Sequence, residues 1–389
     1  MDKNLLKYCK SGAQERAIRA IIEKGSMGKA AKHLGMAKST ICEHSNQVKL
    51  QAAIKGYAPD EKMTRPVADP FVVKGTSMMF RGDSDEPSMT WVKTAVDRKQ
   101  MLELAEKMGK AFFEGRTPLK LVKPPERVNN DLLSCYVIAD LHIGMYSWAR
   151  ETGQDYDCDI ASQCLLGAMD RLMAKTPPSG ECLIAQLGDL LHLDDDSNQT
   201  RRSGNALDVD TRYARVAEVG FRLYRRAIDR ALQRHQKVHV VNVPGNHDDV
   251  SAMWLGIALK GAYESNPRVT IDTSPGAYFY HQFGKNLIGM CHGHTCKMNA
   301  LGEIMVSDRP KLIGETEYRY WLTGHIHHEK SVDLRNCKVE SFRTLAARDA
   351  WHSNSGYRSM RDMKAIVFHR EYGEDERYTV SVREILGDD

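Results

Sequence analysis

The first 60 residues carry a helical pattern of hydrophobic positions. Apolar residues recur at helical spacing over Ala17–Ile22, and a Gly-Ser pair then interrupts the pattern. Ser26 suits the N-cap of a short second helix, and Gly35 suits its left-handed end. A third helix is expected over about residues 37–55, and Pro59 closes the segment.

The pattern changes after Pro59. Two runs rich in β-formers, residues 71–80 and 88–96, flank a charged loop and predict a pair of strands. An amphipathic helix is expected over Lys99–Phe113. A polar, proline-rich linker follows over 115–130. The whole segment therefore reads as a connector.

From Leu132 onward, buried strands alternate first with helices and then mostly with one another. Strands are expected over 132–140 and 181–189 and from Lys237, with helices over 160–175 and 211–235 between them. Further strands are expected in the segments 277–282, 286–294, 318–328, 338–343, 364–370 and 378–383. This order predicts an α/β fold, a β-sandwich flanked by helices, preceded by a small all-α domain. The predicted domains are 1–58, 59–128 as a connector with a hairpin and a helix, and 129–389.

Composition limits the class of protein. A chain of 389 residues with 42% hydrophobic and 27% charged residues is ordinary globular material of two or three domains. It contains no apolar run of about 18 residues, and charges interrupt its first residues, so we expect neither a membrane helix nor a secretory signal. Nine scattered cysteines without a CxxC pair are typical of reduced thiols, which favours a cytoplasmic location.

Charge is unevenly distributed. Residues 1–60 hold 11 Lys and Arg against 5 Asp and Glu, a net charge of +6, although the whole chain is only +4. A basic module on a nearly neutral body indicates a polyanionic partner at one end.

Five short polar motifs each follow a predicted strand. They are Asp140-Leu-His142, Gly-Asp189-Leu-Leu-His192, Gly-Asn246-His247-Asp248, His292-Gly-His294 and Gly-His325-Ile-His327. Strand carboxyl ends are where α/β folds place their sites. Carboxylate, amide and imidazole donors together suit Mn, Fe, Zn or Co rather than a cysteine-rich structural zinc site.

This motif series resembles that of the calcineurin-like metallophosphoesterases over about residues 132–370. The resemblance implies two divalent ions, with manganese expected and Fe, Zn, Co or Mg as alternatives. It assigns Asp140, His142 and His327 to the first ion, Asn246, His292 and His325 to the second, and Asp189 as the bridge between them. The Gly-Asp-x-x-His variant is closest to the DNA repair nuclease branch, whereas the His-Gly-His element is more like small phosphodiesterases.

Three further residues are candidates for catalysis. His247 is expected to act as general acid, with Asp248 orienting its imidazole. His192 either contacts the scissile phosphate or makes an outer hydrogen bond. A hydroxide held by the metals would attack the phosphate. We expect His294 and His328 to lie outside the ligand set.

The N-terminal helices resemble a helix-turn-helix such as those fused to this kind of domain in phage-borne proteins. Ala31 sits at the helix contact, Gly35 in the turn and Ile41 in the core. The residues near the groove-facing side would be Lys38, Ser39, Thr40, Glu43 and His44. The alternative is a helical bundle whose charges are simply solvated.

The resulting hypothesis is a dimetal phosphodiesterase that cleaves DNA, a nuclease tethered to its substrate by the N-terminal domain. The alternative is a phosphatase or small-nucleotide phosphodiesterase. DNA is the expected partner and no membrane is expected. The sequence leaves open whether the chain forms a homodimer. A phage-encoded chain would work in the host cytoplasm. Basic and aromatic residues in the loop at 193–212 and in the segment 341–362 are further candidates for phosphate contact and stacking.

Overall fold

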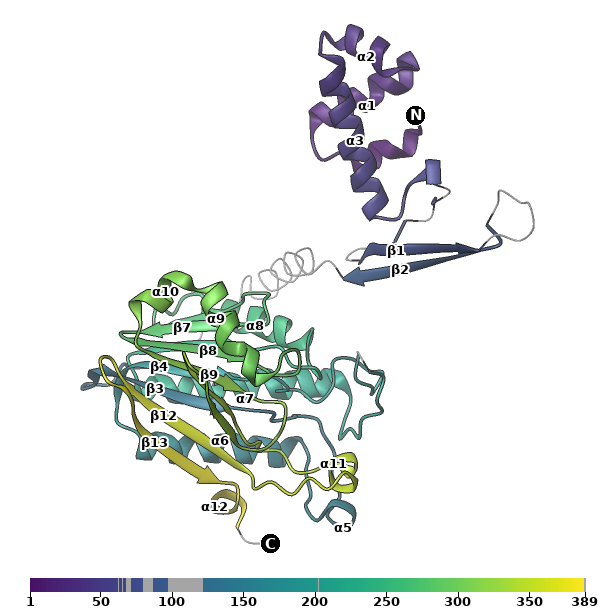
Figure 1. Ribbon diagram of the computed structural model, residues 1–389. Coiled ribbons are helices and arrows are strands. Elements are labelled where there is room, and N and C mark those ends of the chain that lie inside the picture. Colours follow the sequence, from purple (N-terminus) through teal and green to yellow (C-terminus); the bar gives the residue numbers. More distant parts are fainter. Residues whose placement is uncertain are drawn as a thin grey trace. The chain divides into compact units, whose positions relative to one another are not determined.

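A computed structural model describes residues 1–61, 63, 64, 66, 67, 71–79, 87–96, 122–201 and 203–387. It contains two compact units, Met1–Leu104 and Ala105–Asp389 (Figure 1). The expected helix over Lys99–Phe113 and most of the charged loop before Ser88 lie outside the described residues. The domain boundaries stay predictions.

The first unit begins with three helices in the expected order. They are α1 (Gly12–Lys24), α2 (Met27–Leu34) and α3 (Lys38–Ile54), with short 3-10 turns η1 (Lys3–Tyr8) and η2 (Pro59–Glu61) beside them. The Ser26 side chain accepts a hydrogen bond from the Lys29 N–H at 3.3 Å, and Gly35 ends α2 with φ at 62°. Both predicted caps are therefore confirmed. Ile18, Ile41 and Val48 are fully buried in the core that the helices share.

A two-stranded antiparallel sheet follows. Its strands are β1 (Phe71–Met79) and β2 (Met89–Val96), and Met79 is paired with Met89. The prediction of two strands around a charged loop is confirmed.

The second unit is built on two sheets (Figure 1). The six-stranded sheet has the order β13-β12-β3-β4-β5-β6, and its central strands β3 to β6 are parallel. Its strands are β3 (Asn129–Ile138), β4 (Ser179–Gln186), β5 (Lys237–Asn242), β6 (Val269–Asp272), β12 (Asp362–His369) and β13 (Gly373–Ser381). The five-stranded sheet has the order β10-β11-β9-β8-β7. Its strands are β7 (Phe279–Phe283), β8 (Asn286–Cys291), β9 (Tyr318–Thr323), β10 (Lys330–Asp333) and β11 (Lys338–Ser341).

Helices cover the outer face of each sheet, so the unit has four layers. Alternate residues of β3 enter two cores: Tyr136 packs with the helices α6 (Cys158–Lys175), α7 (Tyr213–Arg234) and α8 (Ser251–Ala262), whereas Val137 packs between the sheets. Strands buried on both faces read as continuous apolar runs, which is why they were recognisable in the sequence. On the far side, Trp321 packs with α9 (Leu301–Asp308), and α10 (Pro310–Glu315) follows. The predicted α/β sandwich with flanking helices is confirmed.

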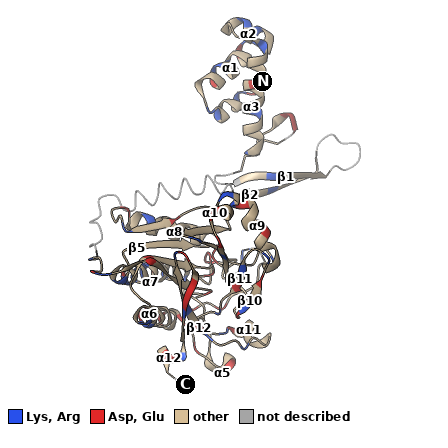
Figure 2. Ribbon diagram, turned by 60° about the vertical axis from the view of Figure 1, so that its left-hand side comes forward, with Lys and Arg blue, Asp and Glu red and all other residues tan. Residues whose placement is uncertain are grey.

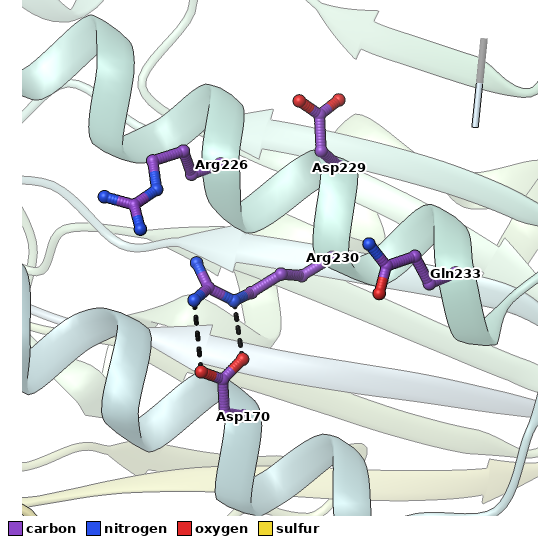
Figure 3. A pocket seen from close by; sticks show the side chains of 5 residues that line it. All are labelled: Asp170, Arg226, Asp229, Arg230 and Gln233. Carbon is purple, nitrogen blue, oxygen red and sulfur yellow. Dashed lines mark hydrogen bonds and ion pairs between the residues drawn. The ribbon is translucent and has the colours of Figure 1, made fainter.

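The helical layer over the six-stranded sheet is tied together at its surface. Arg230 of α7 reaches Asp170 of α6 with two contacts, Nε–Oδ1 at 2.5 Å and Nη2–Oδ2 at 3.1 Å (Figure 3). Arg226, Asp229 and Gln233 line the same shallow depression between the helices. The Asp170 side chain is about half exposed, so this pair contributes little to stability.

Several elements were not expected from the sequence. They are α5 (Ala149–Thr152), α8, β6, α9, α10, β10, α11 (Ala350–Asn354) and α12 (Arg383–Leu386). All nine cysteines are free thiols. Among the described residues, no helix combines the length and apolarity that crossing a membrane requires.

Candidate metal centre

The five polar motifs meet because they follow neighbouring strands. Asp140, Asp189 and Asn246 come shortly after the parallel strands β3, β4 and β5. His292 directly follows β8, and the Gly-His-Ile-His motif follows its parallel neighbour β9. The carboxyl ends of parallel strands lie at one edge of a sheet. The polar motifs that follow the strands of both sheets therefore lie at the same end of the sandwich.

Asp140, His142 and His327 form the first group of donors. Their ligand atoms all lie within 4.8 Å of one another. His142 Nε2 is 3.2 Å from His327 Nε2, and His327 Nε2 is 3.4 Å from Asp140 Oδ1. Two ligands of one ion at ordinary bond lengths of about 2.1 Å lie roughly 3.0–3.4 Å apart, so this spacing fits a shared cation.

Asp189, His292 and His325 form the second group, and Asn246 joins it. His292 Nε2 lies 3.1 Å from Asp189 Oδ2 and 3.0 Å from Asn246 Oδ1. The other ring nitrogen of His292 donates to the Leu187 carbonyl at 2.8 Å. Such a hydrogen bond orients the ring so that Nε2, once it gives up its proton, is the atom available to a metal.

Asp189 belongs to the second group and also interacts electrostatically with the first. Its Oδ1 accepts the His247 N–H at 2.8 Å, while Oδ2 faces His292, and its charge reaches His142 and His327 of the first group. Burial alone would raise the pKa of Asp189, but His292 and His247 outweigh burial and hold it well below the usual range. Burial would likewise lower the pKa of His292, yet Asp189 and Asp140 raise it to about 10. Positive charge is therefore favoured where these carboxylates converge, as a cation site requires.

The backbone at the site is unusual. Among the described residues, six non-glycine positions have positive φ, and five of them are predicted ligands. These five are Asp140 (49°), His142 (48°), Asp189 (52°), His325 (72°) and His327 (55°). Such conformations cost energy and concentrate at functional sites, where the surrounding structure enforces them.

Close approach of the loops also requires a residue without a side chain. A Cβ at Gly245 would lie 1.9 Å from Asp189 Oδ1, and a Cβ at Gly324 would lie 2.5 Å from Asp140 Oδ2. The glycines of Gly-Asn-His-Asp and Gly-His-Ile-His therefore let the backbone pass directly beside the ligand carboxylates.

His192 and His247 lie beside the first group. Their rings stack at 5.1 Å, and His192 Nδ1 is 3.2 Å from His142 Nδ1. Burial lowers the pKa of His192 to about 3, and its Nε2 is buried without a hydrogen-bond partner among the described residues. Burial, reinforced by His247, holds the pKa of His142 well below its ordinary value. Both rings are therefore neutral at pH 7.

Asp248 has a different role from the one expected. Its carboxylate accepts backbone N–H groups of Asp189 (3.2 Å), Leu191 (3.1 Å) and Gly245 (2.9 Å), whereas the His247 ring faces the His192 carbonyl. The prediction that Asp248 orients the imidazole is thus wrong, because consecutive side chains leave the loop in different directions. Asp248 instead clamps the two ligand loops together.

One pair beside the site had not been picked out from the sequence. The His352 ring stacks on the ligand ring of His327 at 4.7 Å, and His352 Nδ1 lies 2.7 Å from Asp349 Oδ1. Burial would raise the pKa of Asp349, but the hydrogen bond from His352 lowers it to about 2. The Asp-x-x-His spacing at the start of α11 was the available signal.

The other basic candidates near the site are largely engaged. Arg343 pairs with Asp362 at 2.6 Å, and Arg348 donates to the Thr152 carbonyl at 3.0 Å. Arg201 lies 3.6 Å from Asp194, and Arg202 falls outside the described residues. Trp351, by contrast, is 61% exposed.

The proposed DNA-contacting residues lie at the start of α3 in the first unit. Lys38 and Ser39 are exposed, and Thr40 and His44 are half-buried. Lysine and arginine occur on all three helices (Figure 2). Arg19, Lys24 and Lys49 pair with acids of the same unit. The cations that form no ion pair within the described part of the chain include Lys29, Lys32 and Lys38.

No protein-family model and no curated protein matches the chain. Among solved structures, it is similar to the phosphoesterase YfcE from E. coli, with 12% identity, a TM-score of 0.31 and coverage of 64% of this chain and 99% of that one. It is also similar to Vps29 from Entamoeba histolytica complexed with Zn²⁺, with 12% identity, a TM-score of 0.26 and coverage of 64% and 99%. A third is an archaeal phosphodiesterase, with 9% identity, a TM-score of 0.32 and coverage of 64% and 99%. Function has to be inferred from the site itself.

Proposed function

We propose that the chain is a metal-dependent phosphoester hydrolase. The observation that carries the proposal is the meeting of two donor groups, Asp140–His142–His327 and Asp189–His292–His325, which approach to 3.9 Å between His292 Nδ1 and Asp140 Oδ1. Oxygen and imidazole donors without thiolate suit hard and borderline divalent ions. When bound, two such ions supply Lewis-acid chemistry and positive charge that neutralises a phosphate ester.

The protein's own contribution is to hold the donors in place. The His292 ring is anchored on the Leu187 carbonyl, and both oxygens of Asp140 accept the His325 N–H, at 3.0 and 2.9 Å. The clamp by Asp248 fixes the loop that carries Asp189. Because these contacts exist within the chain, the ligands need little rearrangement when ions and substrate bind.

His247 is the proposed proton donor. A carbonyl oxygen can only accept, so the 3.0 Å contact to the His192 carbonyl places a proton on His247 Nδ1. This leaves Nε2 as the atom that exchanges a proton with the leaving group. His192, stacked on the same ring and buried, holds His247 in this orientation.

DNA is the substrate class that the first unit favours. Its net charge of +6 over residues 1–60, the exposed Lys38 and Ser39, and the lysines of α2 together suit a phosphate backbone. The proposed enzyme is therefore a DNA phosphodiesterase, a nuclease, whose helical module binds the polymer.

The deciding experiment is hydrolysis by the full chain with Mn²⁺. Single-stranded DNA, duplex DNA, para-nitrophenyl phosphate and its bis ester are compared, with Asp189→Asn as the inactive control. Cleavage of DNA and of the bis ester is expected. Activity on the monoester alone would favour a phosphatase, and inactivity on all four substrates would overturn the proposal.

DNA binding is tested separately through salt. Log affinity for duplex DNA should fall linearly with log salt, by ~0.9 per phosphate neutralised. Lys38→Ala should weaken binding and reduce this slope. The matched control is Lys311→Ala, since that side chain is 87% exposed in the second unit. Equal affinities and slopes for the two variants would remove Lys38 from the interface.

A further inference from the structure

A second cluster of metal-ligating side chains lies between the two sheets. Glu181 of β4, His239 of β5 and His281 of β7 place their ligand atoms within 4.8 Å of one another. The Leu183 and Val241 side chains, two residues further along β4 and β5, belong to the core between the sheets. Side chains alternate along a strand, so Glu181 and His239 face that same layer.

His281 approaches from the opposite sheet. It stands between Phe279 and Phe283 on β7, both of which are buried in the core between the sheets. The cluster therefore joins three strands of two sheets. Glu181 lies near the start of β4, whereas Asp189 follows the end of that strand, so the cluster is separate from the candidate metal centre.

The spacing within the cluster fits a shared ion better than a hydrogen bond. His239 Nε2 lies 3.4 Å and His281 Nε2 3.9 Å from the same oxygen, Glu181 Oε2. Charge-assisted N–H···O bonds are shorter, at about 2.7–2.9 Å. Two ligands of a tetrahedral Zn²⁺ at bond lengths of about 2.0–2.1 Å lie roughly 3.3–3.4 Å apart. The His239 contact has that spacing, and the His281 contact is about 0.5 Å longer.

The surroundings of His281 point the same way. Its Nε2 atom is buried and has no hydrogen-bond partner among the described residues. Leaving such a nitrogen without a partner is unfavourable, so a buried donor or acceptor normally has one. Burial lowers the pKa of His281 to about 4, which leaves the ring neutral and able to act as a ligand.

We propose that Glu181, His239 and His281 bind a third metal ion, with zinc as the ion of choice. Two histidines and one glutamate form a known zinc ligand set, and a water would complete the tetrahedron. The Glu181 and His239 side chains are about one-quarter exposed, which gives water and the ion access from the rim of the sandwich. Such an ion would link the five-stranded sheet to the six-stranded sheet, because His281 belongs to the first and Glu181 and His239 to the second.

The test is zinc stoichiometry of the full chain. Wild-type protein is saturated with Zn²⁺, dialysed and measured by inductively coupled plasma mass spectrometry. Three equivalents are expected in wild type and two in Glu181→Gln and His281→Gln. Glu317→Gln, which alters an exposed carboxylate elsewhere in the same unit, should retain three. Zinc should also raise the melting temperature of wild type by more than that of the variants, because an ion bound only to the folded state stabilises it.

The result can be separated from that for the candidate metal centre. Hydrolysis of the bis ester by Glu181→Gln should equal that of wild type, which also shows that the variant is folded. If His281→Gln does not fold, the zinc stoichiometry of Glu181→Gln and of His239→Gln, which alters a partly exposed side chain, tests the proposal instead. Equal zinc content in wild type and in the folded cluster variants would overturn the proposal, whatever number of ions the candidate metal centre holds.

Discussion

Gly245→Ala should disable the candidate metal centre although it adds one methyl group. The new Cβ would lie 1.9 Å from Asp189 Oδ1 and 2.3 Å from Asp189 N, and real Cβ atoms essentially never approach closer than 3.0 Å. Asp189 and the backbone at residue 245 must therefore separate by about 1.1 Å. The movement would also break the hydrogen bond from His247 N–H to Asp189 Oδ1, which is 2.8 Å long. A misplacement of about 1 Å at a catalytic group can lower the rate about 10²-fold.

The assay is kcat/KM for hydrolysis of the bis ester in Mn²⁺, with metal content measured on the same samples. We expect a fall of at least about 10²-fold together with reduced metal occupancy. Gly314→Ala is the matched control, because its Cβ would meet nothing within 4 Å and its φ is not positive. Circular dichroism of both variants separates local displacement from unfolding. If Gly245→Ala hydrolyses the ester as fast as Gly314→Ala, the close packing of the two ligand loops does not matter for activity.

Three further predictions concern ligands, proton transfer and pH. Asp189→Asn should lower metal occupancy at both donor groups, whereas Asp140→Asn should lower it mainly at the first. Two full equivalents of metal bound by Asp189→Asn would refute the role of Asp189 as the bridge between the ions. His247→Gln should keep its metals and slow DNA cleavage ~10²–10⁴-fold, with a smaller loss on the para-nitrophenyl ester, whose leaving group needs no proton; equal losses would argue against a general acid. His235 is fully buried, and burial lowers its pKa to about 3 in the folded chain, from 6.5 in the unfolded chain. The folded state therefore favours the neutral ring, and the protein loses stability as pH falls below 6.5. Urea unfolding at pH 7 and 5 should show wild type losing roughly 2 kcal/mol more than His235→Gln, and equal losses would contradict the buried neutral ring.

The sequence predicted most of the strands that are buried on both faces. β3, β4 and β8 read as apolar runs followed by polar motifs, and all were located to within a few residues. β6 and β10 were missed because each has four residues of which at most one is buried, whereas β11, equally short, has three buried residues. α8 was missed because its apolar residues surround the helix without a clear polar face.

Predicting side-chain contacts was harder than predicting which motifs meet; the assignment of metal ligands stays a prediction. Motif order alone brought Asp140, Asp189 and His325 to one edge of the sandwich. Adjacency suggested that Asp248 supports His247, but the turn of the loop sends the two side chains apart. The contact of His352 with His327 and the cluster around Glu181 each join segments distant along the chain. Local spacing marks only the Asp349–His352 pair and neither of these contacts.

Backbone strain is concentrated in the loops that carry the predicted ligands. A residue with positive φ costs of order 1–3 kcal/mol unless its surroundings compensate, and five ligands adopt this conformation. The compensation is reciprocal: Asp140 accepts the N–H of His325, and Asp189 accepts the N–H of His247, so each ligand carboxylate also fixes the backbone of the next ligand loop. The buried carboxylate of Asp248 adds three backbone hydrogen bonds to the same loops. These hydrogen bonds hold the donors in position within the chain, and such preorganisation is what the proposed catalysis at a metal centre would require.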